Sequence, residues 1–130
     1  MKNNQLKILL IGSGGREHSL ALKLKESNQG PALFIAPGNA GTAQCGTNVQ
    51  INDTDIDTLL KFAINNNIDL TIVGPEAPLV EGIVDTFNEN NLNIIGPDKI
   101  GAQLEGSKAW SKAFMEKYDI PTAGYKEFTN

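Results

Sequence analysis

The feature that most constrains the fold is a near-continuous apolar run at residues 6–11 that ends directly at a glycine-rich loop. Such a run is typical of a strand buried on both faces of a parallel sheet. The 130 residues are enough for roughly one domain with a real core. Four further short strands are predicted along the chain, at residues 32–36, 48–51, 70–73 and 93–95.

Helical patterns fill the gaps between these strands. Apolar side chains recur at helical spacing in residues 17–27, 55–66 and 78–90. Thr54 and Asp57 resemble a capping box at the start of the second helix, and Pro78 suits the first position of the third. Strands that alternate with helices predict an α/β fold, a doubly wound open parallel sheet with helices on both faces. Ligands bind such sheets at the carboxyl ends of the strands, where glycine-rich loops follow here.

Composition narrows the class of partner. The net charge is −4 and no cluster of Lys and Arg is visible, so we expect no nucleic-acid partner. The longest apolar stretch, residues 8–11, is too short to span a bilayer, and we expect no membrane association. Cys45 is the single cysteine and allows no internal disulfide, which fits a cytoplasmic protein. His18 is the only histidine; it gives no metal cluster and is interpreted as shaping its loop by hydrogen bonding.

The loop after the first strand is the strongest candidate for chemistry, and it reads Gly12-Ser13-Gly14-Gly15-Arg16-Glu17-His18. Glycines allow a tight turn and the close approach of an anion. The helix that follows offers free backbone N–H groups and the positive end of its dipole. We interpret the loop as a phosphate cradle in which these exposed N–H groups hold the anion; a plain turn between strand and helix is the alternative. Arg16 either adds a charge-assisted bond to that phosphate or is simply solvated.

Two other nucleotide-binding loops are disfavoured by the residues themselves. A dinucleotide site requires a third glycine where Glu17 stands, and an acidic residue at the end of the second strand. That strand instead ends at Ala36-Pro37-Gly38-Asn39, which carries no carboxylate. A P-loop requires Lys-Ser or Lys-Thr after the glycines, and neither is present.

Three further segments carry candidate binding residues. Gly38 and Asn39 belong to a second glycine-rich loop, which suits either contact with a ligand or simple flexibility. Glu76 lies between two prolines after the strand at residues 70–73, where its carboxylate can accept bonds from sugar hydroxyls or a substrate amine; the alternative is an acidic residue that merely favours a helix start. Lys108 falls in the first turn of a predicted helix, where a cation is electrostatically unfavourable, so a functional role competes with that of a surface lysine.

Taken together, these loops resemble those of phosphoribosylamine–glycine ligases, which act in de novo purine biosynthesis. The matching segments are GSGGREH at residues 12–18, APGNAGTA at 36–43, VGPEAPL at 73–79 and LEGSK at 104–108. They occur in the family's order and spacing through most of the chain. The set is highly specific, whereas any one segment alone would be a weak signal.

The resemblance implies an ATP-grasp ligase that uses ATP and Mg²⁺ (or Mn²⁺) to phosphorylate glycine. The amine of 5-phosphoribosylamine then attacks the acyl phosphate, giving glycinamide ribonucleotide. It implies that the phosphoribosyl substrate is held by Gly12, Ser13, Gly14, Gly15, Arg16, Gly38, Asn39 and Glu76, with Glu76 on the ribose hydroxyls. Lys108 matches the family's nucleotide-contacting lysine. No residue of this chain is expected to be catalytic or to bind metal, since the metal ligands are expected beyond Asn130.

The pattern changes after Pro97. Short helices are predicted at residues 100–104 and 107–118, and residues 122–128 are expected to begin another strand. We therefore expect residues 1–100 to form a substrate-binding, pre-ATP-grasp domain, and residues 101–130 to hold linker helices and the start of an ATP-grasp domain. We expect a monomer that cannot make product alone.

Three rival functions remain at this stage. One is a non-catalytic module that binds sugar phosphates or nucleotides. Another is an NAD-dependent oxidoreductase, which Glu17 disfavours. The last is a related ATP-grasp enzyme such as a carboxylase, which shares the fold but not this set of loops.

Overall fold

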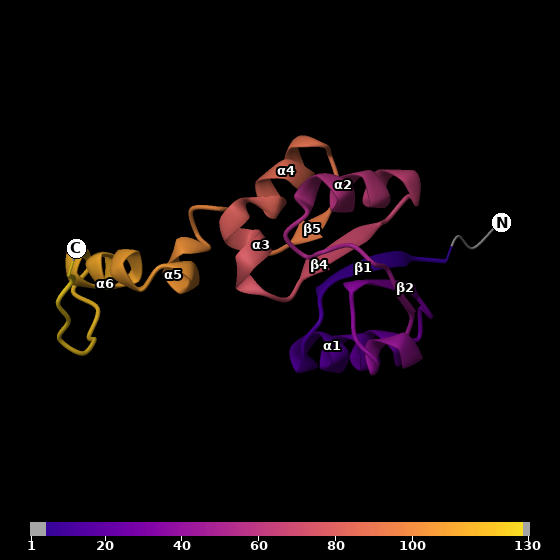
Figure 1. Cartoon of the computed structure of the whole chain (residues 1–130), viewed down its shortest axis with the longest axis horizontal. Helices are drawn as coiled ribbons and strands as arrows, with labels where there is room; N and C mark the ends of the chain where they lie inside the picture. The colour runs from indigo at the N-terminus through magenta and orange to yellow at the C-terminus, as the bar shows by residue number, and fades with distance from the viewer. Residues whose placement is uncertain (1–4, 129–130) are drawn as a thin grey trace.

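Five parallel strands form one open sheet in the order β3-β2-β1-β4-β5, as seen in a computed structural model that describes residues 5–128 (Figure 1). The strands are β1 Lys7–Gly12, β2 Ala32–Pro37, β3 Thr47–Asn48, β4 Leu70–Val73 and β5 Ile94–Ile95. The predicted fold class, a doubly wound open parallel sheet, is confirmed. The strand expected at residues 48–51 is shorter and begins earlier, at Thr47.

The central strand β1 explains why the apolar run is nearly continuous. It pairs with β2 on one side and β4 on the other, so both of its edges and both of its faces are covered. Leu9 and Ile11 contribute to the apolar core on one face of the sheet, and Ile8 and Leu10 to the core on the other. Each of these four side chains is at most 3% exposed, as expected for a strand enclosed by two layers of helix.

Helices cover both faces of the sheet. Their bounds are α1 Gly15–Lys25, the short 3₁₀ helix η1 Thr42–Gln44, α2 Ile56–Asn65, α3 Glu76–Glu81, α4 Ile83–Glu89, α5 Gln103–Gly106 and α6 Lys108–Lys117. Figure 1 shows α1 below the sheet and α2 and α4 above it, with α3 at the end of the strands nearest α5 and α6 at the far end of the molecule. No helix within residues 5–128 combines the length and the apolar character that a membrane crossing requires.

The helix predicted at residues 78–90 is two helices. The break falls at Gly82, whose φ of 94° is left-handed and therefore favours glycine. The first helix begins at Glu76, so Pro78 occupies its third position rather than its first. The predicted apolar stripe is nevertheless buried, because the side chains on either side of the break turn toward the same core: Leu79, Ile83, Val84 and Phe87.

The capping box predicted at the start of α2 is wrong. The N-terminal cap is Asp55, whose carboxylate accepts a bond from the N–H of Thr58 at 3.2 Å. The Thr54 hydroxyl instead donates to the Asn52 side chain at 2.8 Å, which turns it away from the helix. The Thr54 hydroxyl therefore bonds within the turn at Asn52 instead of capping the helix.

Asp55→Ala is expected to lower the free energy of unfolding by about 1 kcal/mol, because it removes this cap. Chemical denaturation followed by far-ultraviolet circular dichroism measures the loss. Asp57→Ala is the matched control, since it deletes a carboxylate from the same first turn without removing the cap. An equal loss in both variants would show that charge rather than capping stabilises this end of α2.

The C-terminal segment departs most from expectation. The predicted helix at residues 100–104 lies instead at Gln103–Gly106, and α6 follows with Ser107 as its cap. The strand expected at residues 122–128 is wrong, since the described residues after α6 form no strand. Instead, the Lys112 ammonium donates to Thr122 and Ala123 at 2.6 and 2.9 Å and folds this segment back along α6. Without a neighbouring strand, extended backbone has no partner for its hydrogen bonds.

Candidate functional site

The candidate site lies where the strand order reverses. From β1 the chain proceeds outward through β2 to β3, and then returns to fill the other side with β4 and β5. The border between β1 and β4 is therefore the switch point at which open α/β sheets bind ligands. The first glycine loop follows β1 and the loop that contains Glu76 follows β4, so both predicted loops flank this border.

The start of α1 offers a small set of free donors. Within residues 5–128, no group accepts a hydrogen bond from the backbone N–H of Ser13, Gly15 or Arg16. All three residues are exposed. The N–H of Gly14 differs, because it donates to Glu17 Oε2 at 2.7 Å. The amide of Gly14 is therefore already bonded inside the protein, and the role of Gly14 in binding a ligand stays a prediction.

From the sequence, Glu17 was not predicted to be a site residue. It was considered only because a dinucleotide-binding loop would have a glycine at that position. Its side chain is 3% exposed, and its Oε1 has no hydrogen-bond partner among the described residues. A Cβ built on Gly12 would lie 2.7 Å from Glu17 Cδ, and one on Gly74 would overlap the same carboxylate. These two glycines are therefore required by Glu17 itself, and not only by the approach of an anion.

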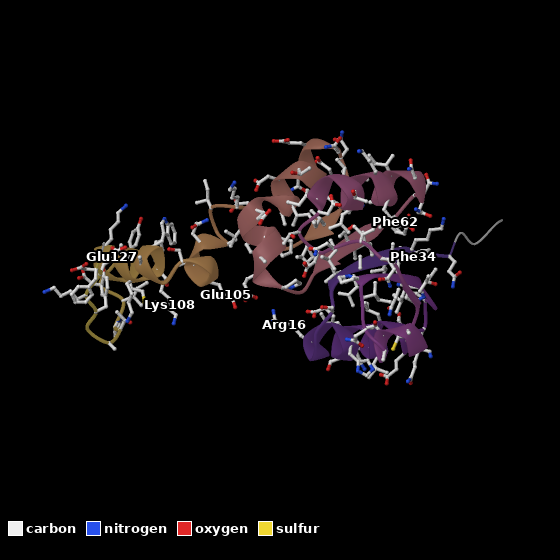
Figure 2. The ribbon with its side chains drawn as sticks, in the orientation of Figure 1. Arg16, Phe34, Phe62, Glu105, Lys108 and Glu127 are labelled. Atoms are coloured by element: carbon white, nitrogen blue, oxygen red, sulfur yellow. The ribbon has the colours of Figure 1, made fainter. Side chains whose placement is uncertain are left out.

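Arg16 joins the first loop to the third. Its guanidinium donates to the carbonyl of Gly74 at 2.5 Å, a contact that neither of the two earlier interpretations included. Figure 2 shows Arg16 at the end of α1 that faces toward α5 and α6. A guanidinium has five N–H donors, so one bond to a carbonyl leaves others available for an anion.

The side chain of Asn39 is fully used within the protein. Its Nδ2 donates to the carbonyls of Ser13 and Gly14 at 2.8 and 3.2 Å. Its Oδ1 accepts from the N–H groups of Gly41 and Thr42 at 2.8 and 3.0 Å. The amide therefore bridges the second loop to the first and has no donor to spare for a ligand.

A buried hydroxyl supports this bridge and was also missed. Thr42 is fully buried, and its Oγ1 donates to Asn48 Oδ1 at 2.7 Å and accepts from the N–H of Asn39 at 2.7 Å. Asn48 Nδ2 in turn donates to the carbonyl of Asn39 at 2.7 Å. Gly38 packs against Asn48 and donates its N–H to the carbonyl of Gly12 at 3.1 Å. Both missed residues looked ordinary in the sequence, Thr42 as part of a loop and Asn48 as the start of a weak strand.

His18 shapes the second loop by packing. A Cβ on Gly41 would lie 2.5 Å from the imidazole ring, so ring and glycine are in close contact. The prediction that His18 shapes its loop by hydrogen bonding stays a prediction, and the contact seen within residues 5–128 is the packing of the ring against Gly41. The half-buried ring therefore holds the second loop against α1.

Glu76 and Lys108 are exposed and lie on different elements. Glu76 is the first residue of α3, and no described residue bonds its carboxylate, which leaves it available to a ligand. Lys108 is the first residue of α6 and borders a hollow that is also lined by Lys112, Tyr125, Lys126 and Phe128. Figure 2 shows Lys108 on the side of the molecule that Arg16 faces.

This arrangement can bind a molecule with an anion at one end and hydrogen-bond donors at the other. Free N–H groups at the start of a helix favour a phosphate, and the exposed carboxylate of Glu76 favours hydroxyl or amine groups. No group of three or more metal-binding side chains exists among residues 5–128. We assign no metal-dependent step to these residues.

Known proteins resemble the chain over most of its length. The family described as "Phosphoribosylglycinamide synthetase, N domain" matches residues 6–105. The phosphoribosylamine–glycine ligase of Clostridium acetobutylicum is 54% identical over 125 residues, which cover 96% of this chain and 30% of that protein. The corresponding ligase of Escherichia coli K12 is 57% identical over 126 residues, covering 95% and 29%. The chain thus spans about 30% of the length of these curated relatives.

Solved structures agree with this result. A phosphoribosylamine–glycine ligase from Thermotoga maritima superposes with a TM-score of 0.64 at 31% identity, over 92% of this chain and 26% of that one. The N5-carboxyaminoimidazole ribonucleotide synthetase of Thermus thermophilus superposes with a TM-score of 0.67 over 88% of this chain and 31% of that one, and its 23% identity supports the fold alone. The chain therefore belongs to the phosphoribosylglycinamide synthetase N-domain family, the N-terminal region of phosphoribosylamine–glycine ligases of the ATP-grasp type.

Proposed function

We propose that the chain is the N-terminal part of an enzyme that joins glycine to 5-phosphoribosylamine with hydrolysis of ATP, and that its role is to hold the phosphoribosyl group. Relatives more than 50% identical are phosphoribosylamine–glycine ligases, and this similarity supports the proposed reaction. One structural observation supports the role: free N–H groups at the start of α1 lie at the switch point of the sheet, in the loop next to that of Glu76.

The residues then divide into two groups. The N–H groups of Ser13, Gly15 and Arg16 receive the 5′-phosphate, and Glu76 accepts bonds from the ribose hydroxyls. Gly12, Gly14, Gly38 and Asn39 act indirectly, because their contacts hold the loops in place. Holding the substrate amine beside an activated glycine carboxylate contributes proximity, which needs no nucleophile from this chain.

ATP and Mg²⁺ (or Mn²⁺) belong to the proposed reaction but not to this site. When bound in a complete ligase, they supply phosphoryl transfer to the glycine carboxylate. Lys108 is the one residue here that we propose contacts the nucleotide. The metal ligands are proposed to lie in the part of the ligase that corresponds to residues beyond 130.

Ribose 5-phosphate is expected to bind weakly to the purified chain and to shift the backbone amide signals of Gly15 and Arg16 in nuclear magnetic resonance spectra. Gly14 provides an internal control, since its N–H donates to Glu17 and is expected to shift less. NAD is expected to produce no saturable shift. Perturbations confined to other elements would exclude the phosphate position proposed here.

The chain alone is expected to form no glycinamide ribonucleotide from glycine, ATP and 5-phosphoribosylamine, because it spans about 30% of the length of its curated relatives and the metal ligands are proposed to lie in the remaining part. Product analysis by chromatography checks this expectation. Detectable product would show that this chain carries the catalytic machinery. Binding without product, even after the chain is joined to the remaining part of a homologous ligase, would favour a non-catalytic sugar-phosphate module.

A further inference from the structure

Glu17 combines two properties that rarely occur together in a side chain with no function. It is a carboxylate with 3% exposure, and one of its oxygens, Oε1, has no hydrogen-bond partner among the described residues. Buried carboxylates are normally paired or fully hydrogen-bonded, because desolvation of the charge is unfavourable. The only salt bridge within residues 5–128 joins Lys23 and Glu26, so no cation neutralises Glu17 directly.

The place of this carboxylate is also informative. In a dinucleotide-binding fold, the third glycine of the first loop would occupy position 17, and a pyrophosphate would lie on the start of the helix. Here Glu17 Oε2 accepts the N–H of Gly14, and the carboxylate fills the space beside Gly12 and Gly74. One of the amides that would face a pyrophosphate is therefore bonded to a carboxylate oxygen of the protein itself.

We propose that Glu17 makes this site selective for ligands with a single phosphate, because its buried carboxylate holds a negative charge where a second, adjacent phosphate would lie. One phosphate can use the free N–H groups of Ser13, Gly15 and Arg16. A diphosphate would have to extend toward Gly14, whose amide is taken, and would meet a like charge in a partly desolvated place. The inference rests on the proposed function for the identity of the natural ligand, but not for the phosphate selectivity itself.

The test compares inorganic phosphate with inorganic pyrophosphate. Amide shifts of Gly15 and Arg16 report their association constants for the unaltered chain and for Glu17→Gln, which keeps the shape of the side chain and an oxygen for Gly14 but removes the charge. The ratio of phosphate to pyrophosphate binding is expected to fall at least about tenfold in Glu17→Gln. Thermal melting of each variant reports whether the fold is retained.

Two further variants separate charge from structure. Glu89→Gln removes the same charge from an exposed position at the end of α4 and is expected to leave the ratio unchanged. Glu17→Asp retains the charge but shortens the side chain, and is expected to keep most of the selectivity even if it melts at a lower temperature. An unchanged ratio in Glu17→Gln, or an equal change in Glu89→Gln, overturns the inference.

The outcome also distinguishes this inference from the proposed function. If ribose 5-phosphate fails to bind while the ratio changes as expected, the proposed substrate is wrong and the role of Glu17 stands. If ribose 5-phosphate binds and the ratio does not change, the opposite holds. If no variant binds either inorganic probe, the selectivity inference is overturned, and the titration with ribose 5-phosphate still decides the proposed function.

Discussion

Gly74→Ala is expected to destabilise the chain by about 2–3 kcal/mol, one of the two largest losses predicted here. A Cβ at this position would overlap the carboxylate of Glu17, which is buried and has little room to move. The φ of Gly74 lies outside the left-handed region, so alanine suits its backbone and the loss comes from the overlap. Urea unfolding followed by tryptophan fluorescence and circular dichroism measures the change in midpoint.

A second substitution tests whether Glu17 is the cause. In the double variant Gly74→Ala with Glu17→Ala, the overlapping carboxylate is gone. Its loss of unfolding free energy is therefore expected to be smaller, by about 1 kcal/mol or more, than the sum of the losses in the two single variants Gly74→Ala and Glu17→Ala. Gly15→Ala is the steric control, because no atom lies within 4 Å of a Cβ built there, and a change within about 0.5 kcal/mol is expected. Simple additivity in the double variant would contradict the proposed contact between Gly74 and Glu17.

The sequence predicted the sheet well because strand signals are local. The four residues of β4 were located correctly, and β1 begins and ends one residue after the apolar run that predicted it. The apolar stripe predicted within residues 55–66 is buried at Leu59 and Ala63. The positions of the glycine loops followed from the same reasoning, since every loop that follows a parallel strand emerges at one edge of the sheet. The architecture of the candidate site was therefore predictable without a relative.

The contacts and hydrogen bonds between the loops of the site were not predictable in this way. Glu17 is buried because β4 lies beside β1 and brings Gly74 against it, although the two residues are far apart in the chain. The bridge from Asn39 to Ser13 likewise spans two loops that the sequence does not connect. The residue type predicts which hydrogen bonds a side chain can make. Which partner it bonds in the folded protein depends on which loops lie next to each other.

Errors at helix boundaries have a different cause. Apolar periodicity continues across Gly82, so the pattern predicted one helix where a left-handed glycine separates two. At α2, either Thr54 or Asp55 could serve as the N-terminal cap. Asp55 is the cap because the Thr54 hydroxyl is bonded to Asn52. In both places the apolar face was assigned correctly, because burial of that face does not depend on where the helix begins.

Asn39→Ala is expected to lower the free energy of unfolding by about 3 kcal/mol, comparable to the loss for Gly74→Ala. The substitution removes four side-chain hydrogen bonds, two to the carbonyls of the first loop and two from N–H groups of its own loop. Asn39 is half-buried, so water only partly replaces these partners. Chemical denaturation gives the stability, and the same samples can be titrated with ribose 5-phosphate.

Asn39→Asp separates the two sets of bonds. An ionised Asp still accepts from the N–H groups of Gly41 and Thr42, but it cannot donate to the carbonyls of Ser13 and Gly14 and places a negative charge against them. If Asn39 acts by holding the first loop in position, both variants are expected to weaken ribose 5-phosphate binding to Gly15 and Arg16 although neither residue is altered. Asn65→Ala at the exposed end of α2 is the matched control and should affect neither quantity by more than about 0.5 kcal/mol. Full binding by Asn39→Asp would mean that the first loop keeps its shape without this bridge, and that its own glycines are sufficient to form the phosphate site.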